Sequence, residues 1–127
     1  MKLKSIDHLV LPVEDIERSL HFYTKILGME LDSSNNRYAL KFGTQKINLH
    51  RGKAEFLPAA KKPTFGSADL CFLADGLLSD IKAEIEQKGI VVEEGIVRRT
   101  GAQGLLNSIY VRDPDGNLIE ISTLVSG

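Results

Sequence analysis

The chain has 127 residues, of which 43% are hydrophobic and 26% are charged, and its formal net charge is −1. This length suits one domain, and the composition excludes a disordered chain, which would combine low hydrophobicity with high net charge. Because 16 Lys and Arg residues are balanced by 17 Asp and Glu residues, and Cys71 is the single cysteine, we expect no nucleic-acid partner, no disulfide framework and a cytoplasmic location.

The first expected element is a short strand over residues 6–13, which is rich in branched apolar residues. Pro12, Glu14 and Asp15 interrupt this apolar stretch, so we expect neither a signal peptide nor a membrane span. Asp15 is placed to cap a helix that ends at Gly28. The apolar stripe of that helix comprises Ile16, Leu20, Tyr23 and Leu27. Three strand-like runs follow at residues 29–31, 38–42 and 46–50, with a turn at 43–45.

The second half repeats this order. The same offset of 61 residues separates Asp69 from His8 and Gly89 from Gly28. The expected elements are a strand at 70–73, a helix with the stripe Leu78, Ile81 and Ile85, strands at 90–93, 108–112 and 117–122, and a turn at 113–116. The sequence therefore predicts an α+β fold of two tandem βαβββ units, about residues 4–60 and 65–124. The helices are expected on the outer face of a mixed sheet that curves around a cavity.

Period-2 alternation along each strand predicts which side chains face that cavity. Apolar residues such as Leu9, Ile47, Ile109 and Ile119 are expected to pack under the helices. Their neighbours then face the cavity: His8, Val10, Asn48, His50, Asp69, Cys71, Tyr110, Glu120 and Ser122.

Three features together resemble the vicinal oxygen chelate superfamily, which includes glyoxalase I, fosfomycin-resistance proteins and extradiol dioxygenases. They are His8 on the first strand, the doubled βαβββ unit, and Asp-Pro-Asp-Gly-Asn-Leu-Ile-Glu at residues 113–120. The resemblance extends over almost the whole chain and implies one such domain over residues 1–127. Residues 22–30, 45–50 and 99–104 resemble, more narrowly, the glyoxalase-domain-containing protein 5 subfamily and bacterial virulence-associated glyoxalase-like proteins.

The resemblance implies one divalent metal ion between the two sheets, which chelates a small substrate through two neighbouring oxygens and acts as a Lewis acid. His8 falls on the first-strand ligand of the family and Glu120 on its final carboxylate ligand, while Asp69 stands where His is usual. One imidazole and two carboxylates suit Ni, Zn, Mn or Fe. Taken alone, His8 also suits a hydrogen-bonded core histidine, and Asp69 a partner for a nearby Arg.

Asn48 stands where glyoxalase I has a second Glu that serves as ligand and base. An amide oxygen can coordinate a metal, but an amide cannot accept a proton as a general base. His50, two residues further on the same strand face, is the predicted replacement, and Glu120 is the other predicted catalytic residue. The alternative for His50 is a histidine at the rim that contacts water or backbone.

Asn48, Arg99 and Tyr110 are the predicted substrate-binding residues. Arg99 lies in a basic segment, residues 98–104, whose glycines allow a loop to move over an anionic substrate such as a glutathione conjugate. The alternatives are an exposed connection without a ligand for the segment, and a half-buried aromatic for Tyr110.

The resemblance thus predicts a metal-dependent lyase or isomerase like glyoxalase I (lactoylglutathione lyase). A thiol transferase of the fosfomycin-resistance type and a non-catalytic drug-binding protein of the bleomycin-resistance type are the alternatives. The expected partners are a small-molecule substrate, including a glutathione or other thiol adduct, and a second copy of the chain in a homodimer.

Overall fold

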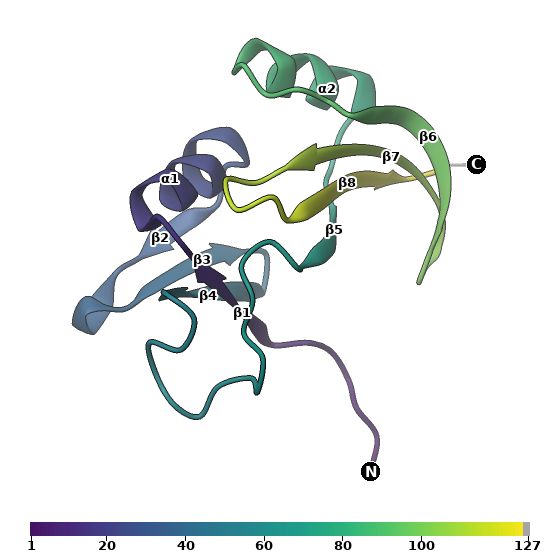
Figure 1. The fold of residues 1–127 in the computed structure, drawn as a ribbon. Coiled ribbons are helices and arrows are strands. Elements are labelled where there is room, and N and C mark those ends of the chain that lie inside the picture. Colours follow the sequence, from purple (N-terminus) through teal and green to yellow (C-terminus); the bar gives the residue numbers. More distant parts are fainter. Residues whose placement is uncertain (126–127) are drawn as a thin grey trace. The chain divides into compact units, whose positions relative to one another are not determined.

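The structure, a computed structural model, describes residues 1–125 and divides the chain into two compact units, the first ending at Gly66 and the second beginning at Ser67 (Figure 1). Each unit contains one four-stranded mixed sheet and one α-helix between its first two strands. The expected α+β fold with two tandem βαβββ units is therefore confirmed. No helix in the described part of the chain is long and apolar enough to cross a membrane.

The first unit contains β1 (His8–Val13), α1 (Ile16–His21), a π-helical segment (Phe22–Ile26), β2 (Glu30–Asp32), a 3₁₀ turn (Ser34–Asn36), β3 (Tyr38–Phe42) and β4 (Gln45–Arg51). The strand order is β1-β4-β3-β2. The β1–β4 pair is parallel and the other two pairs are antiparallel. The first strand of the unit therefore pairs with its last strand, and β1 lies at the edge of this sheet.

The helix of the first unit starts as expected but has a different inward face. The Asp15 carboxylate accepts a hydrogen bond of 3.1 Å from the backbone N–H of Arg18, as an N-cap does. After His21 the helix widens into the π-helical segment, which rotates the positions that follow. The buried helical residues are therefore Ser19, Phe22, Tyr23 and Ile26, of which only Tyr23 belongs to the expected stripe.

The second unit contains β5 (Asp69–Leu73), α2 (Leu78–Gln87), β6 (Glu94–Gly101), β7 (Gly104–Arg112) and β8 (Leu118–Leu124). The strand order is β5-β8-β7-β6, with β5 and β8 parallel. Leu78 and Ile85 of the expected stripe of α2 are buried.

Two expectations for this unit are wrong. Residues 90–93 do not form a strand, since β6 begins only at Glu94, where pairing with Tyr110 of β7 starts. The branched side chain of Val91 favours a strand at these residues. Val91 is instead 76% exposed, and no neighbouring strand among residues 1–125 pairs with it. Arg98–Gly104 is not a mobile loop: Arg98 and Arg99 lie within β6, and Gly101 pairs with Gly104 at the end of a hairpin.

The turn at residues 113–117 fixes the start of β8. One carboxylate oxygen of Asp113 accepts hydrogen bonds from the backbone N–H groups of Asp115 and Asn117, at 3.0 and 2.9 Å. The Asn117 side chain donates to the other oxygen of Asp113 and accepts from the backbone N–H of Ala68, both at 2.8 Å. These bonds join the turn to the residue before β5, and so fix the register in which Cys71 lies beside Glu120.

Candidate functional site

The strand register places the polar residues of the first unit on one face of its sheet. His8 lies beside Lys46, and Val10 lies beside Asn48, across the parallel β1–β4 pair. Asn48 in turn lies opposite Ala39 of β3. Ile47 and Leu49, which alternate with these positions, are buried. The expected alternation is thus confirmed, with His8, Asn48 and His50 on the face opposite to the core.

The imidazole ring of His8 is oriented by its neighbour in sequence. Its Nδ1 lies 2.8 Å from a carboxylate oxygen of Asp7, and its side chain is 44% exposed. A carboxylate that accepts from Nδ1–H leaves Nε2 as the nitrogen that can bind a metal, which is the usual arrangement of a ligating histidine. His8 is therefore not a fully buried core histidine.

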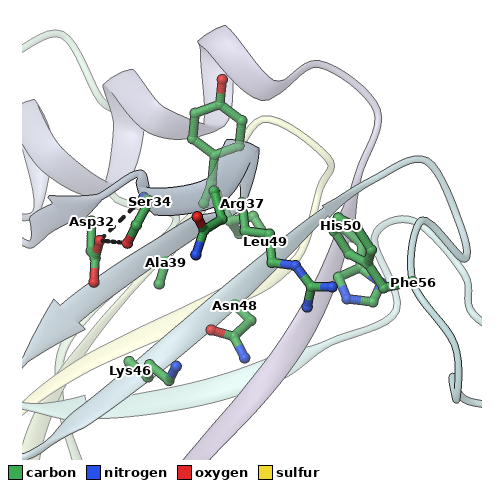
Figure 2. A pocket seen from close by; sticks show the side chains of 11 residues that line it. Asp32, Ser34, Arg37, Ala39, Lys46, Asn48, Leu49, His50 and Phe56 are labelled. Atoms are coloured by element: carbon green, nitrogen blue, oxygen red, sulfur yellow. Dashed lines mark hydrogen bonds between the residues drawn. The ribbon is translucent and has the colours of Figure 1, made fainter.

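A cavity of about 230 Å³ lies on this face of the first unit (Figure 2). Asn48 and His50 both line it. The His50 ring makes an edge-to-face contact with Phe56, with centroids 5.4 Å apart. His50 is thus half-buried against an aromatic ring on one side of the cavity.

In the second unit, Glu120 is held by two serine hydroxyl groups. Ser108 on β7 donates a hydrogen bond of 2.7 Å to Oε2 of Glu120, and Ser122 approaches the same oxygen at 3.2 Å. The Oγ atoms of the two serines are 2.6 Å apart, and both side chains are buried. Oε1 of Glu120 accepts neither of these bonds. The carboxylate is therefore oriented by groups that have little freedom to move.

Cys71 extends this network on the other side. Its Sγ lies 3.3 Å from Oγ of Ser122, and the side chain is exposed rather than buried as a small core residue would be. Desolvation of the sulfur is the main cause that raises the pKa of the Cys71 thiol, and the charge of Glu120 raises it further. Either atom can be the donor in the contact between Cys71 and Ser122 and in the contact between Ser122 and Ser108.

Asp69 is exposed, two residues before Cys71 on β5, so alternation places it on the same face. No ion pair of Asp69 with an arginine is found among the described residues. The carboxylate is therefore accessible to a ligand.

Arg99 and Tyr110 contact each other on the same sheet. The Nε of Arg99 donates a hydrogen bond of 2.9 Å to the Tyr110 hydroxyl, and an Nη2 of Arg99 lies 3.3 Å from a carboxylate oxygen of Glu94. The hydrogen bond to Tyr110 is the main cause that raises the pKa of Arg99. Arg99, Cys71 and Glu120 also line a cavity of about 310 Å³ in this unit. Arg99 is thus fixed at the edge of a cavity.

The donor chemistry of the predicted residues fits a divalent metal. One oriented imidazole and an oriented carboxylate are ligands that Ni, Zn, Mn and Fe accept. Within each unit, the described residues contain no group of three His, Cys, Asp or Glu side chains that is placed to hold a metal ion. The predicted set, His8 with Asp69 and Glu120, draws on both units, and its role stays a prediction.

Several residues that line these cavities or hold Glu120 were not identified from the sequence. Ser108 belongs to the expected strand at 108–112, and its alternation with Tyr110 places it on the cavity face, but a serine in an apolar strand carries no specific signal. Arg37, Lys46 and Phe56 line the cavity of the first unit. They come from two strand ends and a loop, whose proximity no local pattern predicts.

Comparison with known proteins places this chain among related ones. The family model for the glyoxalase/bleomycin resistance protein/dioxygenase superfamily matches residues 5–121. A virulence protein of Salmonella typhimurium, STM3117, is 54% identical over 126 residues, which cover 98% of this chain and 88% of that protein. A glyoxalase domain-containing protein of Mycosarcoma maydis, RDO1, is 46% identical, covering 97% and 70%.

Solved structures agree with this relationship. The integron cassette protein VCH_CASS1 of V. cholerae is 53% identical, with a TM-score of 0.95 and 98% of each chain covered. The lactoylglutathione lyase of Agrobacterium tumefaciens is a more distant likeness, 25% identical with a TM-score of 0.73, and covers 96% of this chain and 95% of its own. On this evidence the chain belongs to the glyoxalase/bleomycin resistance protein/dioxygenase superfamily.

Proposed function

We propose that the protein is a metal-dependent lyase or isomerase of the glyoxalase I kind, acting on a small substrate that presents two neighbouring oxygens. The observation that carries this proposal is the orientation of the Glu120 carboxylate by Ser108 and Ser122, at 2.7 and 3.2 Å. A carboxylate held by buried hydroxyl groups beside an open cavity suits a ligand better than a solvated side chain. The distant likeness to lactoylglutathione lyases supports the same reaction class.

His8, Asp69 and Glu120 would hold a divalent ion, which would polarise a substrate carbonyl when bound. The Nδ1 contact of His8 with Asp7 keeps Nε2 available for this role. Residues on the face of the first unit then position the substrate. The Asn48 side chain offers an amide donor and acceptor, and His50 offers a nitrogen that can take a proton.

An isomerisation of this kind moves one proton between adjacent carbon atoms and needs no second reactant. His50 is the residue that we assign to this transfer, because Asn48 cannot act as a base. His50 lies two residues from Asn48 on the same strand, about 7 Å along it. Arg99, which lines the cavity of the second unit, would contact the substrate there, together with Tyr110, whose hydroxyl accepts a hydrogen bond from Arg99.

A thiol transferase is the second candidate, and Asn48 is the observation that favours it. Addition of a thiol to an electrophile does not require the carboxylate base that Asn48 replaces. The side chain of Asn48 lines the cavity of the first unit, so position 48 of β4 offers no carboxylate that could act as the base. A substrate assay separates the two reactions.

The test uses the full chain loaded with Ni, Zn, Mn or Fe and, in parallel, the chain treated with a chelator. One assay follows formation of the thioester from the hemithioacetal of methylglyoxal and glutathione. A second follows loss of free thiol in the presence of fosfomycin. Metal-dependent thioester formation supports the proposal, and metal-dependent thiol loss alone supports the transferase. If both rates are independent of metal and of His50→Ala, the proposal fails.

A further inference from the structure

The cavity of the first unit is formed around a small residue. Ala39 of β3 lies between Asn48 of β4 and Asp32 of β2 in the strand register. Its methyl group is shorter than the side chains on either side, so the sheet face is hollow at this point. The resulting cavity, about 230 Å³, is smaller than the about 300 to 1,000 Å³ of pockets that take a complete drug-sized ligand. Its size therefore suits one terminal group of a substrate.

The charged residues that line this cavity are Arg37, Lys46 and Asp32, two cations and one carboxylate. The Asp32 carboxylate already accepts hydrogen bonds from the hydroxyl and the backbone N–H of Ser34, at 2.7 and 3.3 Å. These bonds hold the pKa of Asp32 below its ordinary value. In Figure 2 Asp32 and Ser34 lie at one end of the cavity and the Arg37 guanidinium at the other.

The positive charge of Arg37 is not neutralised by an acidic side chain. Arg51, the next arginine in the unit, forms an ion pair with Glu55, at 2.8 Å from its Nε. No ion pair of Arg37 is found among the described residues. Arg37 thus differs from Arg51 and Arg99, which both have carboxylate partners.

An aromatic ring holds the Arg37 guanidinium in place. Its Cζ atom lies 4.0 Å from the centroid of the Phe56 ring, as a cation–π contact requires. The His50 ring contacts the same ring edge-to-face, and Figure 2 shows Arg37, Phe56 and His50 gathered at this end. A guanidinium that lies over an aromatic ring keeps its N–H groups available and loses less freedom when it binds.

We propose that this cavity binds an oxyanion of the substrate, a carboxylate or a phosphate, with Arg37 as its principal contact. Arg presents paired N–H donors that match the two oxygens of such a group. Lys46, Asn48 and His50 line the same space and supply a second charge and neutral donors. The inference rests on the proposed function, because it assigns the substrate of that site to small anionic molecules.

The test measures binding of two probes, inorganic phosphate and malonate, to the full chain without added metal. Titrations followed by NMR use the side-chain N–H signals of arginine and asparagine. Arg37→Ala is expected to weaken binding by at least about tenfold, and Arg37→Lys by less, since it retains the charge. Arg18→Ala is the matched control, because Arg18 is an exposed arginine on α1 outside the cavity. It is expected to leave binding unchanged.

A second variant, Ala39→Leu, fills the cavity without changing any charge. It is expected to weaken the binding of both probes as strongly as Arg37→Ala does. Thermal unfolding of each variant shows whether it is folded. The probe that binds more tightly identifies the anion as carboxylate or phosphate. The inference is overturned if neither probe binds, or if Arg37→Ala weakens the binding of the probes no more than Arg18→Ala does. Since no metal or turnover enters this measurement, failure of the proposed reaction leaves its result intact.

Discussion

The hydroxyl group of Ser108 on β7 donates a hydrogen bond of 2.7 Å to Oε2 of Glu120 on β8. The side chain of Ser108 is 0% exposed, so its donor cannot be replaced by water without opening the sheet. Ser122 supports Ser108 from the same strand as Glu120, at 2.6 Å. Glu120 is therefore oriented before any ligand arrives, which lowers the entropic cost of binding.

Removal of the Ser108 hydroxyl is expected to weaken metal binding. Ser108→Ala leaves the Glu120 carboxylate with the longer bond from Ser122 alone, and loss of such a supporting bond typically costs about 10 to 100-fold in metal affinity. The affinity is measured by competition with a coloured chelator. Ser79→Ala, an exposed serine on α2, is the control. An unchanged affinity in Ser108→Ala would show that the bond does not support a ligand.

Asn48→Glu is expected to raise the rate of thioester formation from the methylglyoxal–glutathione hemithioacetal. The change supplies a carboxylate, which accepts a proton where an amide cannot, and general base catalysis typically contributes about 10² to 10⁴-fold. The rate constant kcat of the metal-loaded variant is compared with that of the unchanged chain and of Asn48→Gln. A rate equal to that of Asn48→Gln would mean that position 48 does not lie beside the reacting carbon.

Arg99→Ala is expected to raise KM for an anionic substrate by about tenfold while changing kcat little, because a contact made equally in the ground and transition states affects binding alone. Arg98→Ala is the matched control. Arg98 is the preceding residue of β6 and contacts Asn107, with Nε to Oδ1 at 3.2 Å, outside the cavity lining. Steady-state kinetics of both variants provide the measurement. Equal KM values would remove Arg99 from the substrate site.

The Arg51–Glu55 pair is expected to make stability depend on pH. The hydrogen bond from the Arg51 side chain is the main cause that lowers the pKa of Glu55 from its ordinary value of 4.5, and the charge of His50 acts in the same direction. The pair therefore stabilises the fold above that ordinary value, and the contribution is lost as pH falls through the lowered pKa. Glu55→Gln should cost about 1 to 2 kcal/mol near neutral pH.

Urea unfolding at several pH values tests this expectation. The difference between Glu55→Gln and the unchanged chain should shrink as the pH is lowered from about 7 to about 3. Glu86→Gln is the control, since its ion pair with Lys82 is long, at 3.4 Å, and exposed. A difference that is constant over this range would contradict the role of the charge pair.

The strands could be predicted from the sequence where alternation and a turn coincide. Residues 38–42 and 46–50 flank a glycine turn, and β3 and β4 match them within one residue. Val91 shows where this prediction fails. Branched residues at 90–93 favour a strand, but pairing with the neighbouring strand β7 begins only at Glu94. Strand formation depends on a neighbour that local sequence does not specify.

The candidate site, too, could be predicted only in part from the sequence. Alternation predicts the face on which Glu120 and His50 lie, because that face follows from the buried residues beside them. The contacts of Ser122 with Cys71 and Ser108 depend on three strands in register, and the contact of Arg37 with Phe56 depends on a loop. Such contacts form between segments that are distant in the sequence, so no regular spacing of residues along the chain predicts them.

Metal content tests the central claim most directly. The full chain is saturated with each divalent metal in turn, and unbound metal is removed. Elemental mass spectrometry then measures the number of metal ions bound per chain. Retention of one ion per chain is expected, with loss of that ion in His8→Ala and in Glu120→Gln. His21→Ala, which removes an exposed histidine of α1, should retain it. If His8→Ala and Glu120→Gln hold as much metal as the unchanged chain, the assignment of these residues as ligands is wrong.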